Sequence, residues 1–108
     1  MRRGDIVTVA AAGDYGKPRP AVVIQSDTIS ETDSVLVALM TSSIAPAPIF
    51  RLTLEPTETN GLKAPSQIMV DKILAMPREK CGKVIGRMEQ ISVVALNNML
   101  SVMIGLAD

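Results

Sequence analysis

The sequence GKPRPAVVIQSD spans residues 16–27 and joins a short basic segment, made rigid by two prolines, to a strongly apolar run. Pro18 and Pro20 flank Arg19, and each proline fixes its own φ at about −65° and restricts the residue before it. Residues 19–26 are too continuously apolar for a strand with one wet face, which predicts a strand buried on both sides. The guanidinium of Arg19 would then leave a stiff, extended backbone. Such a cation suits a phosphate or carboxylate held in a fixed pose, although a plain loop-to-strand junction would have the same sequence.

Short β-rich segments surround this run. The ranges that predict strands are 5–10, 19–26, 35–41, 50–55 and 66–76, with one more short pairing at 83–87. An Asn60-Gly61 pair predicts a turn between the last two of the longer strands. From Gln90 the apolar residues recur at helical spacing, and Gly105 is a plausible stop. The expected fold is mainly β with a C-terminal helix: a small, barrel-like antiparallel sheet in a single domain over residues 1–108.

The expected helix is more apolar than a lid on a small barrel requires. Its main stripe consists of Val93, Leu96, Leu100 and Met103. A second set surrounds that stripe and leaves little polar surface: Val94, Ala95, Met99, Val102 and Ile104. The helix is therefore either deeply buried or shares a second face with another subunit. In so short a chain we favour a homodimer.

Composition excludes several classes of protein. The 108 residues are 47% hydrophobic, yet no apolar run approaches the roughly 20 residues of a membrane span, and no signal-peptide core is expected. The single cysteine, Cys81, cannot form an internal disulfide, which favours the cytoplasm. The absence of histidine removes Ser-His-Asp and Cys-His catalysis and histidine-based metal sites. Only Tyr15 and Phe50 are aromatic, so a bound single strand of nucleic acid would not lie on stacked rings.

The charges cancel overall but are unevenly spread. Residues 20–59 carry one basic side chain against five acidic ones, whereas residues 60–90 carry six basic against three acidic. A neutral protein with this asymmetry can present a basic face to an anionic partner. A merely solvated surface would have the same composition, so the pattern permits such a face without requiring it.

Several short motifs follow one another along the chain without a large gap. They are RGDIV at 3–7, RPAVVIQSD at 19–27, the Thr-terminated strand 35–41, the segment 66–73 with its Val-Asp-Lys-Ile, and Ile-Gly-Leu at 104–106. In this order they resemble the MazF/PemK (Kid) family of toxin endoribonucleases from bacterial toxin–antitoxin pairs. The resemblance implies a compact SH3-like β-barrel, usually dimeric. It also implies metal-independent, cofactor-free cleavage of single-stranded RNA, and inhibition by a cognate antitoxin.

The resemblance also assigns roles to individual residues. The family's key arginine falls on Arg19, its conserved hydroxyl on Thr41 with Ser42 beside it, and the acid that some members use on Asp71. Two departures matter. Met69 stands where the Kid branch has a catalytic arginine, and the histidine of that branch's first loop is absent. The Arg–Thr pair of the other branch therefore fits this chain better.

The reaction that the resemblance implies requires hydrogen-bond donors in fixed positions. Metal-free RNA cleavage uses the ribose 2′-hydroxyl as nucleophile and passes through a phosphorane that carries extra negative charge, where donors act most strongly. Arg19 can offer two parallel N–H donors and Thr41 a hydroxyl, although Thr41 also suits an ordinary strand end. Asp71 can act as general base if it is sufficiently buried, or it can pair with Lys72 or Arg19. Further RNA contacts are expected from Tyr15, Lys17, Ser42, Arg51, Gln67 and Lys72, of which Arg51 and Gln67 can equally cover a barrel face.

Two other functions stay open. CcdB-like toxins have the same barrel and bind DNA gyrase without catalysis, but they depend on a C-terminal Trp-Gly-Ile, whereas this chain ends in IGLAD and has no tryptophan. A catalytically inactive barrel that binds only antitoxin or RNA is the third reading, because Met69 and the missing histidine both weaken the site. In the ribonuclease reading, a dimer groove would also suit an extended acidic segment of the antitoxin, which would mask the same cations and occupy the RNA path.

Overall fold

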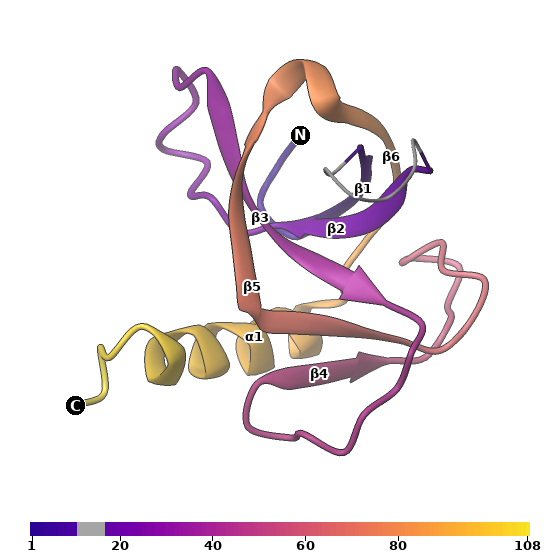
Figure 1. Ribbon diagram of the computed structural model, residues 1–108, viewed down its shortest axis with the longest axis vertical. Helices are drawn as coiled ribbons and strands as arrows, with labels where there is room; N and C mark the ends of the chain where they lie inside the picture. The colour runs from indigo at the N-terminus through magenta and orange to yellow at the C-terminus, as the bar shows by residue number, and fades with distance from the viewer. Residues whose placement is uncertain (11–16) are drawn as a thin grey trace.

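The computed structural model describes residues 1–10 and 17–108, which form a bent antiparallel sheet with one helix at the C-terminal end (Figure 1). The predicted mainly β fold with a C-terminal helix is confirmed. The elements in chain order are β1 (Asp5–Val9), β2 (Arg19–Val23), β3 (Ser34–Thr41), β4 (Arg51–Leu54), β5 (Ser66–Pro77), a 3₁₀ turn (Arg78–Lys80), β6 (Cys81–Arg87) and α1 (Gln90–Met103).

The sheet has the order β4-β5-β3-β2-β1-β6. Its hydrogen-bonded ladder ends at β4 and at β6, so these two strands do not pair to close a barrel. The loop between β4 and β5 bridges the ends instead, because the Arg87 N–H donates to the Thr59 carbonyl at 2.9 Å. The curvature expected of a barrel is therefore present, while closure comes from a loop.

The Asn60-Gly61 turn holds that loop against β6. Asn60 is 1% exposed, and its side chain replaces backbone partners: Oδ1 accepts from the N–H groups of Thr57 (2.9 Å) and Leu62 (3.0 Å). Gly61 has φ +66°, and a Cβ there would overlap the backbone of Ile85 in β6. The turn predicted from the Asn-Gly pair is thus confirmed, and glycine is required there by close approach as well as by φ.

Both faces of the central strands are buried, as the apolar run of β2 predicts. The helix-side core lies between the sheet and α1 and contains Ile6, Val22, Ala38, Met40, Leu54, Leu62, Ile68, Val70, Met88 and Leu96. The second core lies on the opposite face and contains Val7, Val9, Ala21, Val23, Val35, Val37 and Met76. Successive residues of β2 alternate between the two cores.

The strand of the apolar run is shorter than predicted. It ends at Val23, not at Ser26, because the N–H groups of Ile24 (3.0 Å) and Gln25 (3.3 Å) both donate to the carbonyl of Leu36. Two consecutive donors on one acceptor interrupt the regular ladder. The Gln25 side chain then replaces the backbone acceptor, since its Oε1 accepts a hydrogen bond from the Leu36 N–H at 3.0 Å.

β5 bends sharply between its two pairings with β3 (Figure 1). Ile68 pairs with Met40 and Ile73 pairs with Ala38, so four residues of β5 face a single residue of β3. This irregularity lets one long strand serve both halves of the sheet. Asp71 and Lys72 lie in the bend, and both side chains are exposed.

The helix is not deeply buried, so that alternative is wrong. Leu96 is its one buried residue, and Val93, Met99 and Leu100 pack against the helix-side core. Met103, predicted on the buried stripe, is 37% exposed, and Met99 occupies the packing position instead. In the described part of the chain no helix has the length and apolar character needed to cross a membrane.

We expect Gly61→Ala to lower the free energy of unfolding more than Gly4→Ala. Both positions have positive φ, at +66° and +90°, and share the cost of about 1–3 kcal/mol for a side chain in that region. Only Gly61 adds a backbone overlap, because a Cβ at Gly4 would meet nothing closer than Val93 Cγ2 at 3.7 Å. Urea unfolding of both variants measures the difference. Equal losses would contradict the role of the 55–65 loop in bridging the sheet.

Candidate functional site

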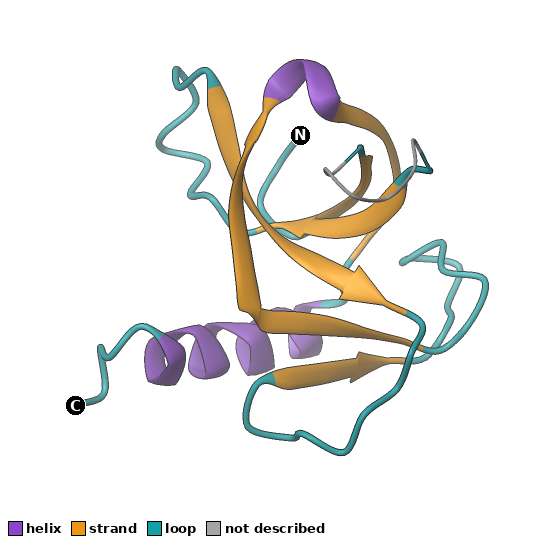
Figure 2. Ribbon diagram, viewed as in Figure 1, coloured by secondary structure: helices purple, strands orange, loops and turns teal. Residues whose placement is uncertain are grey.

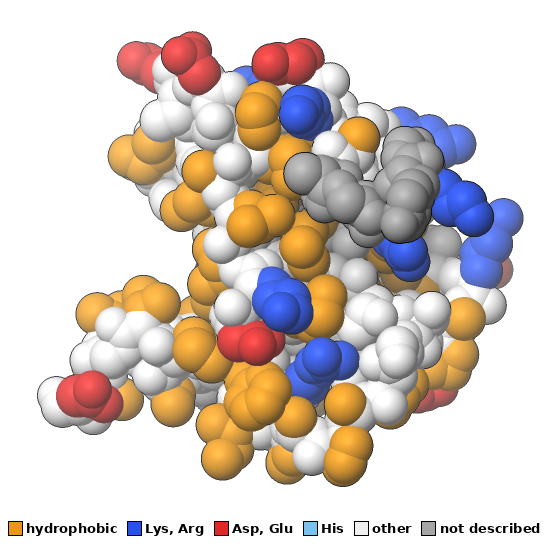
Figure 3. All heavy atoms as spheres, in the orientation of Figure 1, with side chains coloured by type: hydrophobic (Ala, Val, Ile, Leu, Met, Phe, Trp, Pro, Cys, Tyr) orange, Lys and Arg blue, Asp and Glu red, His pale blue; other side chains and the backbone are white. Residues whose placement is uncertain are grey.

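A polar face lies across β2, β3, β5 and β4, on the side of the sheet away from α1 (Figure 2). Strand residues alternate between faces, and Val22, Met40, Ile68 and Leu52 point toward the helix-side core. Their sequence neighbours therefore point the other way. The residues of this polar face are Arg19, Thr41, Arg51, Thr53, Gln67 and Met69. Figure 3 shows basic side chains beside an acidic one over these strands.

The polar face begins where the second core ends. Ala21 of β2 pairs with Leu39 of β3, and the antiparallel register continued by two residues brings Arg19 level with Thr41. Thr41 itself pairs with Gln67, and Gln67 pairs with Thr53. Arg19 is exposed at the start of β2, and Thr41 is half-buried at the end of β3. The two residues predicted to act together are thus on one face of adjacent strands.

The hydroxyl of Thr41 has a fixed orientation. Its Oγ1 accepts a hydrogen bond from the backbone N–H of Ser43 at 3.0 Å. This turn holds the oxygen, and no described residue accepts the hydroxyl hydrogen. The hydroxyl hydrogen of Thr41 is therefore available to a further acceptor, from an oxygen whose position the Ser43 N–H fixes.

Gln67 fastens the loop that follows Thr41. Its Oε1 accepts from the Ala45 N–H at 3.0 Å, and its Nε2 donates to the Ala45 carbonyl at 2.9 Å and to Thr53 Oγ1 at 3.1 Å. The side chain is 3% exposed. Gln67 was predicted as an RNA contact, but its amide is already engaged inside the protein. From this position Gln67 holds the 42–50 loop against β5 through its bonds to Ala45.

Arg51 joins the same network from β4. Its Nη1 donates to the Ser43 carbonyl and to Gln67 Oε1, both at 3.3 Å. Arg51 pairs with Met69 across β4 and β5 and is half-buried. The guanidinium thus sits beside the turn that orients Thr41.

The other predicted contacts lie around this face. Ser42 and Lys17 are exposed, directly after β3 and two residues before β2. Asp71 and Lys72 project from the bend of β5 and are exposed. Asp71 therefore lacks the burial that a role as general base would require. Tyr15 lies outside the described residues.

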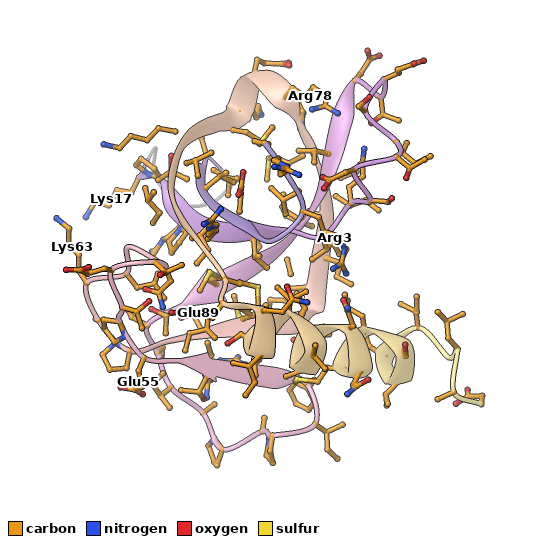
Figure 4. All side chains as sticks on the ribbon, turned by 180° about the vertical axis from the view of Figure 1, so that it is seen from behind. Arg3, Lys17, Glu55, Lys63, Arg78 and Glu89 are labelled. Atoms are coloured by element: carbon orange, nitrogen blue, oxygen red, sulfur yellow. The ribbon has the colours of Figure 1, made fainter. Side chains whose placement is uncertain are left out.

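The basic residues of the 60–90 segment do not form one patch. Lys63 and Lys83 line a shallow groove beside Pro18 and Pro20, and Lys63 projects on the same flank as Lys17 (Figure 4). Arg78 is used internally, because its Nε donates to the Thr32 carbonyl at 2.6 Å. The charge asymmetry of the sequence therefore supports only a small basic flank.

The described residues show neither an activated thiol nor a cluster of metal ligands. Burial raises the pKa of the Cys81 thiol, which keeps it protonated and unreactive at neutral pH. Residues 1–10 and 17–108 contain no group of three or more Cys, Asp or Glu side chains that could hold a metal ion. The polar face therefore offers hydrogen-bond donors and cations as its reactive groups.

Two residues of the network were missed by the sequence analysis. Thr53 accepts from Gln67, and the backbone of Ala45 forms both halves of the clamp. Gln67 and Ala45 are 22 residues apart in the sequence, and an alanine carries no sign of polar interaction. The one available signal was the alternation of polar residues in 50–55, which places Thr53 on the face of Arg51.

We expect Gln67→Met to loosen the 42–50 loop and to lower the free energy of unfolding by about 1–3 kcal/mol. Methionine has a similar size but leaves the part-buried Ala45 N–H without its partner, while the Ala45 carbonyl keeps the Ala47 N–H at 3.0 Å. Amide hydrogen exchange at Ala45 measures the loosening, and it should become faster. Gln90→Met, at the exposed start of α1, is the control. Unchanged exchange at Ala45 in the Gln67 variant would rule out the clamp.

Comparisons with known proteins agree on one group. Residues 2–104 match the model of the PemK-like, MazF-like toxin of type II toxin–antitoxin system. A probable endoribonuclease MazF from Mycolicibacterium smegmatis is 43% identical over 108 residues, which cover 99% of each chain. These two matches carry the sequence evidence.

Solved structures show the same fold at low identity. A mycobacterial endoribonuclease in complex with its cognate antitoxin has a TM-score of 0.82 at 17% identity, with 98% of this chain and 96% of that chain covered. The Mycobacterium tuberculosis toxin MazF-mt6 has a TM-score of 0.80 at 20% identity, with 94% and 96% covered. A MazE–MazF complex from Deinococcus radiodurans has a TM-score of 0.78 at 18% identity, with 97% and 95% covered.

Proposed function

The chain belongs to the PemK-like, MazF-like toxins of type II toxin–antitoxin systems, and we propose that it cuts single-stranded RNA in the cytoplasm without a metal ion or cofactor. The observation that carries this proposal is the position of Arg19 and Thr41 on one polar face of adjacent strands, two residues beyond the Ala21–Leu39 pair, with the Thr41 oxygen held by the Ser43 N–H. The CcdB-like reading is disfavoured, since the matched family is the PemK and MazF group.

In the proposed reaction the ribose 2′-oxygen attacks the adjacent phosphorus and the bond to the 5′-oxygen of the next nucleotide breaks. The products are a 2′,3′-cyclic phosphate and a 5′-hydroxyl. Charge develops on the non-bridging oxygens, and Arg19 and Thr41 donate hydrogen bonds to them. Because the Thr41 hydroxyl is held in advance, it does not have to reorganise during the reaction.

Proton transfer is the less constrained step of the proposal. Asp71 is the one carboxylate within β2, β3, β4 and β5, and the bend of β5 leaves it exposed. Because Asp71 lacks the burial that a general base would need, we assign solvent water to carry the proton from the 2′-hydroxyl to the departing 5′-oxygen. Ser42, Lys17 and Lys72 are assigned to contacts with the flanking RNA, as is Tyr15.

A partner antitoxin is part of the same proposal. Two of the structures with this fold contain an antitoxin, and the polar face carries cations that an acidic, extended segment would neutralise. Occupation of the face by such a segment would exclude RNA. Inhibition would then be competitive with the substrate.

We expect Arg19→Ala and Thr41→Val each to slow RNA cleavage by about 100-fold, because each removes a donor at the developing charge. The assay uses a long unstructured RNA in EDTA, with the cut ends mapped, and Lys80→Ala is the control on an exposed residue away from the face. A 2′-deoxy substitution at the cut position should abolish cleavage. If wild-type protein cleaves the RNA at none of the concentrations tested, the proposal is overturned. If Thr41→Val keeps full activity, Thr41 is not the second donor.

The apolar surface between α1 and the sheet supports a homodimer. The sheet face that forms the helix-side core continues past the helix, where Leu36 is 42% exposed. An open hollow there appears as the notch in the outline of Figure 3. Its lining is mostly apolar (Ile24, Leu36, Ile73, Leu100, Ile104 and Leu106) and includes the polar residues Arg3, Asn97 and Ser101. Ile104 and Leu106 are 60% and 75% exposed. A second copy of the chain would cover this surface with the same residues, as a two-fold interface requires.

We expect Ile104→Glu to shift the protein from dimer to monomer, since a carboxylate is costly to bury in an interface whose lining is mostly apolar. Analytical ultracentrifugation measures the mass. Ile91→Glu is the matched control, because Ile91 is 82% exposed on the same helix but does not line the hollow. A monomeric wild-type protein, or equal loss of dimer in both variants, would exclude this interface.

A further inference from the structure

Arg51 carries a positive charge for which the described residues supply no acidic partner. Its Nη1 bonds to two neutral acceptors, the Ser43 carbonyl and Gln67 Oε1. Its Nε is buried and has no hydrogen-bond partner, and in the described part of the chain it is the one buried side-chain nitrogen or oxygen in this condition. A buried donor without a partner is unfavourable, and more so on a charged group.

Packing alone does not account for an arginine at this position. Met69 lies directly opposite in β5 and is 9% exposed, so the immediate surroundings suit an apolar side chain. The Ala45 clamp is complete without Arg51, because Gln67 makes both of its bonds to that backbone. Polar groups that lower the stability of the fold, and that no other interaction in the fold compensates, are found mostly at functional sites.

The free end of the guanidinium is available to a ligand. Nη2 has no partner among the described residues, and it is not among their buried unpaired atoms, so its two N–H groups reach solvent. Burial of Nε and the bonds of Nη1 fix the plane of the group. A planar cation held in this way suits an anionic oxygen better than a freely moving lysine does.

The position of Arg51 relates it to the proposed cleavage centre. β4 and β2 are three strand spacings apart, and Arg51 is offset by two residues from Thr53, which is level with Thr41 and Arg19. The backbones of Arg51 and Arg19 therefore lie about 16 Å apart along the sheet, at about 4.8 Å for each strand spacing and about 3.3 Å for each residue. Thr41 lies between them. Two guanidinium groups that reach inward from these strands can contact separate phosphates of one RNA chain.

We propose that Arg51 forms a second phosphate subsite, which takes the phosphate next to the one that is cleaved. The inference rests on the proposed RNA cleavage and adds a fixed binding register: Arg19 contacts the scissile phosphate and Arg51 its neighbour. Gln67 and the Ser43 carbonyl act as positioning groups for this arginine. The subsite contributes to binding and leaves the donors at the cleaved phosphate unchanged.

The test uses an RNA with a 2′-deoxy nucleotide at the cut position, which binds but is not cleaved, and replaces its phosphates one at a time by neutral methylphosphonates. We expect wild-type protein to lose affinity by about tenfold or more when the neighbouring phosphate is neutralised, which is the scale of one charge-assisted hydrogen bond. Arg51→Met should bind the unmodified RNA about tenfold more weakly and show no further loss at that phosphate. Arg87→Met, on an exposed arginine of β6, should keep the wild-type pattern.

Thermal unfolding separates a binding role from a structural one. Removal of an uncompensated charge should leave the unfolding midpoint of Arg51→Met unchanged or higher. A lower midpoint together with a uniform loss of affinity at every phosphate would overturn the subsite, and so would wild-type affinity in Arg51→Met. If wild-type protein cuts no RNA, the same methylphosphonate scan is run on an unmodified single-stranded RNA. A phosphate whose neutralisation weakens binding of wild-type protein but not of Arg51→Met then retains the phosphate-binding role of Arg51 while the cleavage proposal fails.

Discussion

Burial of β2 on both faces is the constraint on which the rest of the structure depends. Ala21 and Val23 enter the second core while Val22 enters the helix-side core, so the strand cannot slip by one residue without reversing both. This fixes which side chains of β3 and β5 face each way. The polar face is what remains on one side once the second core has ended at the level of Ala21. Arg19 and Thr41 are the next residues on that side of their strands.

Much of this arrangement could be predicted from the sequence, because it depends on local periodicity. The apolar run of β2, the alternation in β4 and the Asn60-Gly61 turn each indicate their structure within a few residues. Errors arose where distant parts of the chain decide the outcome. Val23 ends its strand because Leu36 accepts two N–H groups, and Met99 replaces Met103 in the packing because the helix diverges from the sheet.

The site was predictable only in part, for the same reason. Arg19 and Thr41 could be placed together from a resemblance that covers the whole chain. The role of Gln67 could not, because a glutamine in a strand is compatible with exposure, and its partner is the backbone of an alanine in a distant loop. In the sequence analysis, Met69 is a departure from the Kid branch. The sequence could not show that the cross-strand partner of Met69 is Arg51, whose guanidinium lies on the same face.

A conflict between stability and RNA binding explains why this face has so few polar groups. It continues directly into a core, so each polar residue on it must either be satisfied internally, as Gln67 is, or remain partly unpaired for a ligand, as Arg51 is. In a small chain each unpaired group takes a large share of the total stability. A ribonuclease built on this sheet therefore has to work with a few donors held firmly by the fold. The Ser43 N–H on Thr41 and the Gln67 amide beside Arg51 are the means by which this chain holds them.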